Sequence, residues 1–203
     1  MKKVIFLAQV TLVVLIVLIA LPSASFAQTT YMVDSKASSL IWHGEKVLGK
    51  HWGYVTIDNG WIKKDGDTYT GEFYIDMTSI TDEDIEDPES RGKLVGHLKS
   101  DDFFSVNNYK MSKFKLTKVE AKDYGEYNHV VVGDLTIKGI TKQISFPAKI
   151  EISDKVMTAK AEFEINRTWW NIKYGSGNFF DDLGDKMIYD DIKFELDLVG
   201  KAK

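Results

Sequence analysis

The sequence of 203 residues contains no cysteine. This absence excludes a disulfide framework, and it also excludes the lipid-modified cysteine that anchors some exported bacterial proteins. Proline is scarce, with three residues, and no stretch rich in proline or serine divides the chain. We therefore expect one folded domain, held together by its hydrophobic core alone.

The motifs of several enzyme classes are also absent. The chain has no Gly-x-Ser-x-Gly elbow and no His-Glu-x-x-His motif, and Gly175-Ser176-Gly177 lacks the lysine of a phosphate-binding loop. His43, His51 and His129 are scattered along the chain. From these absences we predict no nucleophile for hydrolysis, no metal site and no cofactor.

Positive charge is not in excess, because 26 lysines and arginines stand against 30 acidic residues, a net charge of −4. Without residues 1–27, which contribute Lys2 and Lys3 and no acid, the net charge becomes −6. This balance argues against nucleic acid and against an anionic membrane surface as partners.

The N-terminus is typical of a secretory signal peptide. Lys2 and Lys3 precede an apolar run over residues 10–21, and Ser25-Phe26-Ala27 offers small residues for cleavage. The alternative is an uncleaved membrane anchor, but the run is shorter than the roughly 20 residues that a span needs. We predict cleavage after Ala27, a folded domain over residues 28–203 without stable membrane insertion, and a periplasmic or secreted location.

Alternating apolar and polar residues predict eight strands after the signal peptide. They cover residues 38–47, 54–63, 68–79, 112–121, 127–137, 142–152, 157–165 and 192–198. Gly49 and Gly53 indicate a turn or bulge around His51-Trp52. Asp87-Pro88 is typical of a helix start, so one short helix interrupts the strands.

Eight antiparallel strands with one apolar face leave unpaired edges in an open sheet, and closure removes these edges. We predict an all-β fold, a single antiparallel barrel of about eight strands with one short helical insertion. Such a barrel is wide enough to hold one small ligand. Small inward residues would leave space for an apolar ligand, and they are Gly71, Gly133, Ala148, Ala159 and Ala161.

Arg167 is the most distinctive polar residue of this pattern. The apolar parity of the seventh strand ends at Ile165, so the next inward position falls on Arg167. Its guanidinium carries a permanent charge and five N–H donors. We predict that it donates to the head group of a ligand, or stacks on Trp169 or Trp170, or pairs with an acid such as Asp101.

Acidic residues crowd the segment 82–89. A calcium loop beginning at Asp82 would need glycine at its sixth position and glutamate at its twelfth, and the chain has Asp87 and Lys93 there. The calcium template therefore fails, and we interpret the segment as a solvated acidic loop. Binding of another cation stays open.

Four segments form a series along the chain. They are Tyr31-Met32-Val33-Asp34 with Ser39, His97-Leu98-Lys99-Ser100-Asp101-Asp102-Phe103-Phe104, Gly133-Asp134-Leu135-Thr136-Ile137-Lys138-Gly139-Ile140-Thr141-Lys142, and Asn166-Arg167-Thr168 followed by Tyr174-Gly175. In this order they resemble the YceI-like lipid/polyisoprenoid-binding family. The resemblance covers nearly all of the chain after residue 27.

The resemblance implies an extended, lipocalin-like barrel in an exported protein, with a long isoprenoid chain in its cavity. Arg167, with His97 and Asp101, would then orient a polar end such as a quinone carbonyl or a phosphate. For His97 the alternative is an ordinary hydrogen bond to a neighbouring strand. The residues predicted to contact the apolar chain are Trp42, Phe73, Ile75, Phe103, Phe104, Phe114, Leu135, Phe146, Phe163, Ile165, Trp169, Trp170 and Phe194.

We therefore predict an exported lipid-binding protein, a monomer or homodimer and not an enzyme, that carries or stores a polyisoprenoid lipid or isoprenoid quinone. Burial of each CH₂ group, at about 0.8 kcal/mol, would supply the affinity. One alternative is a lipid-modifying enzyme that uses His97 or Asp101 as acid or base in the same cavity. Another is a filled barrel that acts through its surface in stress or adhesion.

Overall fold

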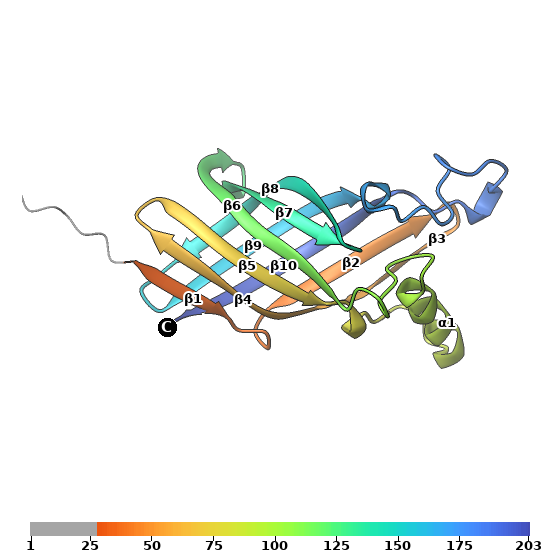
Figure 1. Cartoon of the computed structure of the whole chain (residues 1–203), viewed down its shortest axis with the longest axis horizontal. Coiled ribbons are helices and arrows are strands. Elements are labelled where there is room, and N and C mark those ends of the chain that lie inside the picture. The colour runs from red at the N-terminus through yellow and green to blue at the C-terminus, as the bar shows by residue number, and fades with distance from the viewer. Residues whose placement is uncertain (1–27) are drawn as a thin grey trace, which may run out of the picture.

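The computed structural model describes residues 28–203, which form one strongly curved antiparallel sheet with a helix at one end (Figure 1). The strands are β1 (Thr29–Val33), β2 (Ser39–Lys46), β3 (Gly49–Tyr54), β4 (Thr56–Asp65), β5 (Thr68–Asp76), β6 (Met111–Tyr124), β7 (Tyr127–Ile137), β8 (Ile140–Ile152), β9 (Val156–Asn166) and β10 (Asp191–Ala202). The helices are η1 (Met77–Ser79), α1 (Pro88–Lys99), η2 (Arg167–Trp170) and η3 (Gly184–Lys186). The predicted signal peptide and its cleavage lie outside the described residues.

The short strand β1 closes the sheet into a barrel, because it pairs with β4 on one side and β10 on the other. Tyr31 lies opposite Ile62 of β4 and also opposite Ala202 of β10. The closed ring therefore has eight strands, in the order β1-β4-β5-β6-β7-β8-β9-β10. This confirms the predicted antiparallel barrel, although β1 was not among the predicted strands.

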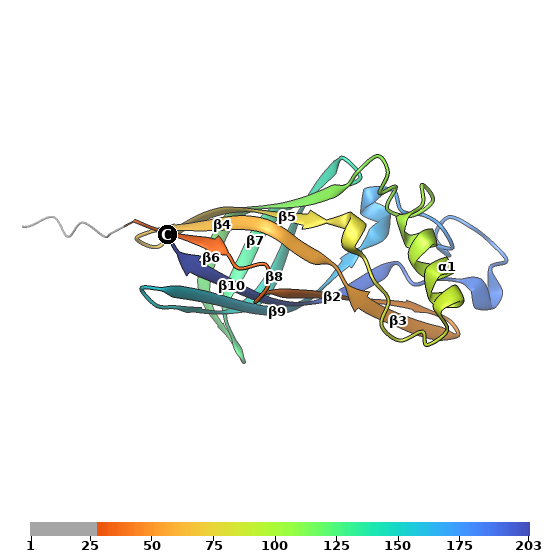
Figure 2. The same cartoon turned by 90° about the horizontal axis from the view of Figure 1, so that it is seen from below.

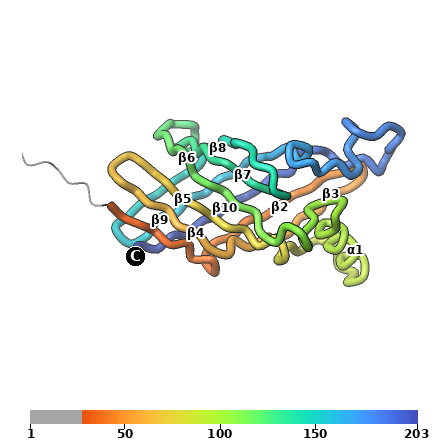
Figure 3. The backbone as a smooth tube through the Cα atoms, viewed as in Figure 1, coloured from red at the N-terminus to blue at the C-terminus, as the bar shows by residue number. Residues whose placement is uncertain are grey.

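Strands β2 and β3 lengthen the barrel at the end that carries α1. Strand β2 continues along β10 beyond β1, and β3 leads through Val55 into β4. Figures 2 and 3 show the β2–β3 hairpin and α1 at one end of the molecule, with the C-terminus at the other. The predicted turn or bulge at His51-Trp52 is wrong, because both residues pair with β2, and His43 lies opposite Trp52.

Helix α1 begins where the sequence predicts. Asp87 is the N-cap and accepts a hydrogen bond from the Ser90 N–H, and Pro88 occupies the first helical position. Leu98 is buried and packs in the same cluster as Phe103. The helix and the turns after it therefore add apolar side chains to one end of the barrel interior.

The third predicted strand ends earlier than expected. Strand β5 stops at Asp76, whose side chain accepts a hydrogen bond from the Thr78 N–H and thereby caps η1. The chain then leaves the barrel wall for the acidic segment that precedes α1. The alternation of apolar and polar residues continues up to residue 79, but the strand ends at Asp76 because its side chain hydrogen-bonds the backbone and starts a helical turn.

Candidate functional site

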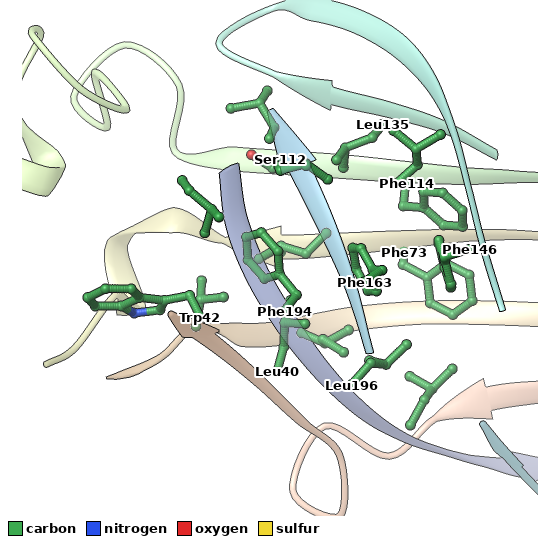
Figure 4. Close-up of a pocket in the computed structure, with 18 of the residues that line it drawn as sticks. Leu40, Trp42, Phe73, Ser112, Phe114, Leu135, Phe146, Phe163, Phe194 and Leu196 are labelled. Carbon is green, nitrogen blue, oxygen red and sulfur yellow. The ribbon is translucent and has the colours of Figure 1, made fainter. Parts of the chain in front are cut away.

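A cavity of about 190 Å³ lies inside the barrel, and almost all of its lining is apolar. Figure 4 shows side chains such as Leu40, Phe194 and Leu196 around this space, and the polar residues of the lining include Ser112 and Arg167. An apolar cavity of about 150 Å³ in another protein stays free of water and takes up benzene or xenon. The space is therefore suited to an apolar ligand.

Five phenylalanines from five strands form a belt across this interior, which we call the phenylalanine belt. Their ring centroids are 6.1 Å apart for Phe73 and Phe114, 5.9 Å for Phe114 and Phe146, 4.4 Å for Phe146 and Phe163, and 5.6 Å for Phe163 and Phe194. The last two pairs are stacked. Contacts of this kind are favourable, so the belt gives the cavity a defined aromatic wall.

The belt fills the position at which we expected open space beside Gly133. A Cβ atom on Gly133 would lie 2.2 Å from Cζ of Phe114, which means that the phenylalanine ring covers the glycine. A Cβ on Gly71 would meet the backbone oxygen of Trp61 at 2.6 Å. The expectation that these two glycines leave volume for a ligand is therefore wrong, because neighbouring protein atoms occupy that volume.

Most of the apolar residues predicted to contact a ligand line the cavity. They are Trp42, Phe73, Ile75, Phe103, Phe104, Phe114, Leu135, Phe146, Phe163, Ile165 and Phe194. Trp169 and Trp170 are not part of the lining. Trp169 is 52% exposed, whereas Trp170 is fully buried and donates its Nε1–H to the Leu135 carbonyl at 3.1 Å.

Further lining residues were not on the predicted list, among them Leu40, Val55, Ile144, Met157 and Leu196. Leu40, Ile144 and Leu196 each stand two residues from a predicted lining residue on the same strand. Their alternation therefore already indicated that they point inward. Val55 lies between β3 and β4, where no strand alternation applies, so only the structure shows that it lines the cavity.

The guanidinium of Arg167 is inside the protein, as its parity predicts, and it is held by backbone carbonyls. Nε donates to Tyr189 O at 3.2 Å, and Nη2 donates to Ile188 O at 3.1 Å. Nη1 donates to Ile172 O at 2.9 Å and to Tyr174 O at 2.8 Å. Four of the five N–H donors of arginine are therefore committed to the chain itself.

Nη2 of Arg167 also lies 3.0 Å from Oδ1 of Asp190, which makes an ion pair, although among the described residues this oxygen accepts no hydrogen bond. The acid that pairs with Arg167 is therefore Asp190, whereas the sequence suggested Asp101. The aromatic ring that faces the guanidinium is Phe103, at 5.6 Å from its centroid, whereas the sequence suggested Trp169 or Trp170. Burial lowers the pKa of Arg167, and the negative charge of Asp190 opposes that shift. A head group would thus find four of the five donors of this side chain already committed to backbone carbonyls.

His97 lies beside the cavity wall and does not line it. Its ring packs edge-on against Phe103 at 5.9 Å and against Tyr174 at 4.3 Å between centroids. Within residues 28–203 the ring makes no hydrogen bond, so the alternative of a bond to a neighbouring strand is not what the structure contains. Its nitrogen atoms stay available near the wall that Phe103 forms.

Asp101 is exposed and serves the turn after α1. Its Oδ1 atom accepts hydrogen bonds from Ser105 Oγ at 2.6 Å and Asn108 Nδ2 at 3.3 Å. The side chain is not part of the cavity lining. Asp101 therefore has a structural role, because its hydrogen bonds hold the turn that follows α1.

The acidic segment after η1 is only partly solvated. Asp82 is 2% exposed, in contrast to the expected solvated loop, because residues 81–84 pack against β3. A Cβ atom on Gly53 would lie 2.1 Å from the Thr81 carbonyl oxygen, so glycine is needed there for the two backbones to approach. The contact brings Asp82 and Asp84 close to His51.

Among residues 28–203, no helix is both long and apolar enough to cross a membrane.

Comparison with known proteins places the chain among bacterial relatives. A model of the YceI-like domain matches residues 31–200. A UPF0312 protein of Vibrio parahaemolyticus is 30% identical over 143 residues, which cover 66% of this chain and 69% of the relative. A UPF0312 protein of Photorhabdus laumondii is 39% identical over 92 residues, which cover 44% of this chain and 45% of the relative.

Solved structures share the fold. BcnA of Burkholderia cenocepacia is 20% identical, with a TM-score of 0.63, over 82% of this chain and 98% of that protein. A domain from Saccharophagus degradans, described as polyisoprenoid binding and implicated in plant cell wall breakdown, is 14% identical, with a TM-score of 0.60, over 85% of this chain and 98% of the domain. At these identities the likeness establishes the architecture alone.

Proposed function

Because the chain belongs to the YceI-like domain family, we propose that its barrel binds the apolar chain of a polyisoprenoid lipid or an isoprenoid quinone. The observation that carries the proposal is the cavity of about 190 Å³ with its apolar lining. The polyisoprenoid-binding description of the Saccharophagus degradans domain, which has the same fold, supports this choice of ligand.

The lining favours a flexible hydrocarbon over a compact polar molecule. Side chains such as Leu40, Phe163 and Leu196 lie inside the barrel and yet keep accessible surface, which faces the cavity. Each CH₂ group that a ligand buries against such surface contributes about 0.8 kcal/mol. The lining continues along β9 from Met157 to Ile165, about 26 Å at the rise of a strand, which suits an elongated chain.

The polar end of the ligand is proposed to lie at the α1 end of the barrel. Tyr189, which belongs to the lining, is 48% exposed there. His97 packs against Phe103 of the lining and has an unbonded ring within the described residues, so it is the better of the predicted head-group residues. Arg167 would shape this end through the carbonyls it binds and through Phe103.

We propose a binding role, as carrier or store, in the periplasm or outside the cell. The enzyme alternative would need a second catalytic group beside His97, and Asp101 is hydrogen-bonded in the turn after α1 and does not line the cavity. The alternative of a filled barrel required an interior without free volume, and the cavity argues against it. Both observations favour sequestration of the ligand over chemistry on it.

The test is native mass spectrometry of the protein, purified without detergent. We expect a bound lipid of several hundred daltons, and we expect protein stripped of lipid to take up an added isoprenoid quinone. A clean ligand-free mass together with no uptake of the quinone would refute the proposal. Uptake of a saturated fatty acid, but of no isoprenoid, would assign the cavity to a different lipid class and would also contradict it.

A further inference from the structure

Three potential metal ligands meet outside the cavity, between β3 and the segment that precedes α1. Nδ1 of His51 lies 3.0 Å from Oδ2 of Asp84 and 3.9 Å from Oδ2 of Asp82. One ligand atom from each of the three residues lies within 4.8 Å of the others. Residues from two distant parts of the chain thus present a nitrogen and two carboxylate oxygens to one point.

The backbone holds this cluster in place. The Thr81 N–H donates to Tyr54 O at 3.0 Å, and the Glu83 N–H donates to Trp52 O at 2.9 Å, so residues 81–83 extend the pairing at the edge of β3. This pairing also covers an otherwise open strand edge. The two aspartates therefore stand on a segment that backbone hydrogen bonds fix to β3.

Each aspartate uses one oxygen for the scaffold and directs the other toward His51. Oδ1 of Asp82 accepts from the Ile85 N–H at 3.1 Å, and Oδ1 of Asp84 accepts from the Trp52 N–H at 2.8 Å. Hydrogen bonds of this kind orient metal-binding carboxylates in known sites. The remaining oxygens, both Oδ2, are those that approach His51.

Asp82 supplies the observation that points to a missing partner. Its side chain is 0% exposed, and within the described part of the chain its Oδ2 atom has no hydrogen-bond partner. A buried acceptor without a partner is costly, so either a proton or a cation is expected at this oxygen.

We propose that His51, Asp82 and Asp84 bind a divalent transition-metal ion of the zinc type. Zinc takes histidine nitrogen and carboxylate oxygen at about 2.0–2.2 Å, and around a tetrahedral ion such ligand atoms are about 3.4 Å apart. The two measured separations, 3.0 and 3.9 Å, lie on either side of that value. Three protein ligands leave the fourth position for water.

Calcium fits the same cluster poorly. It takes six to eight oxygen ligands, whereas this site offers one nitrogen and the Oδ2 atom of each carboxylate, and Oδ2 of Asp84 is also hydrogen-bonded to Nδ1 of His51. Imidazole suits zinc, copper and nickel better than it suits calcium or magnesium. The ring of His51 is 30% exposed, which gives an ion a path from solvent.

A bound ion would clamp the acidic segment to β3 and thereby stiffen one wall of the cavity. The Thr81 carbonyl accepts the Nε1–H of Trp42 at 3.1 Å, and Ile80, beside Thr81 in the chain, lines the cavity together with Trp42. The ion site and the cavity wall are therefore connected through two adjacent residues. The proposal itself does not require that the cavity bind a lipid.

The test is titration of the full chain, without a histidine tag and after treatment with EDTA, with zinc in a calorimeter. We expect one zinc ion per chain and a higher Tm in excess zinc, because an ion that binds only the folded state stabilises it. Added calcium should compete weakly. His51→Gln and Asp82→Asn should each weaken zinc binding about 10-fold or more.

The matched control is His43→Gln, which removes a histidine whose Nε2 lies 2.9 Å from Oε1 of Glu195 on the neighbouring strand. This variant should bind zinc as the wild type does. If Asp82→Asn fails to fold, His51→Gln still tests the site, because His51 is partly exposed and its replacement disturbs the fold less. Absence of zinc binding by the wild type, with a gain in stability for Asp82→Asn, would mean that the aspartates share a proton, and the proposal would be overturned. Equal zinc affinity of wild type and His51→Gln would overturn it as well.

Discussion

The Nη2 atom of Arg167 lies 3.0 Å from Oδ1 of Asp190, and the two side chains are 0% and 10% exposed. The other oxygen of Asp190 accepts hydrogen bonds from Ser176 Oγ at 2.9 Å and Asn178 Nδ2 at 2.7 Å. The pair thus joins the end of β9 to the long connection before β10. Removal of one partner from a buried pair is strongly destabilising, because the other charge stays buried.

Arg167→Lys should destabilise the protein by roughly 3 kcal/mol, because the three donors of an ammonium group cannot serve four carbonyls and Asp190, and each buried polar group left unpaired costs about 1–3 kcal/mol. Urea unfolding measures this change. Lys160→Met is the matched control. It breaks an exposed pair with Asp197 and should cost less than about 1 kcal/mol. A stable Arg167→Lys variant that loses quinone binding would instead assign Arg167 to the head group.

Gly133→Ala should destabilise the barrel by about 1–3 kcal/mol, because the new methyl group meets the Phe114 ring and the Lys115 carbonyl oxygen. Adding Phe114→Leu should restore part of the loss, since the leucine frees the space over residue 133. The control is Gly92→Ala in α1, where nothing lies within 4 Å of the new Cβ. That variant should gain roughly 0.5–1 kcal/mol. Thermal unfolding of the four proteins distinguishes these outcomes.

Leu196→Trp should fill part of the cavity and reduce uptake of an added isoprenoid quinone, with the fold retained. Leu196 lines the cavity and keeps accessible surface there, so a larger side chain has room to enter. Native mass spectrometry measures the fraction of protein with bound quinone. Glu164→Trp, on the exposed face of β9, is the control and should leave uptake unchanged. Equal uptake by both variants would show that the quinone binds elsewhere.

His129 should make stability depend on pH. Burial lowers the pKa of His129 from its ordinary value of 6.5. As the pH falls below 6.5, the unfolded chain gains a proton before the folded protein does, so the free energy of unfolding decreases until the folded pKa is passed. His129→Gln should flatten this part of the profile in urea unfolding between pH 7.5 and about 5. Identical profiles for both proteins would contradict the prediction.

The alternation of side chains is a local property, and it predicted most of the strands and the inward face of the barrel. In β9, Met157, Ala159, Ala161 and Ile165 are buried, as their parity requires. The helix start at Asp87-Pro88 was equally readable, because a cap depends on a few neighbouring residues. The inward position of Arg167 followed from the same alternation, although η2 and not β9 holds it.

The alternation did not predict which acid pairs with Arg167. That Asp190 and four carbonyls would surround Arg167 depends on the path of the chain after η2, which carries no periodic pattern. Likewise, nothing local indicates that Phe114 covers Gly133, since the two residues stand on different strands and meet only through the register of β6 and β7. His51 and Asp82 converge for the same reason, across the edge of β3.

The amino-acid order by itself thus determined which side chains face inward, because successive residues of a strand point to opposite sides whatever lies across from them. The tertiary structure alone decided how much of the interior stays empty and which polar groups meet. Closure by Tyr31 between β4 and β10 sets those distances, and closure is a property of the whole ring of strands.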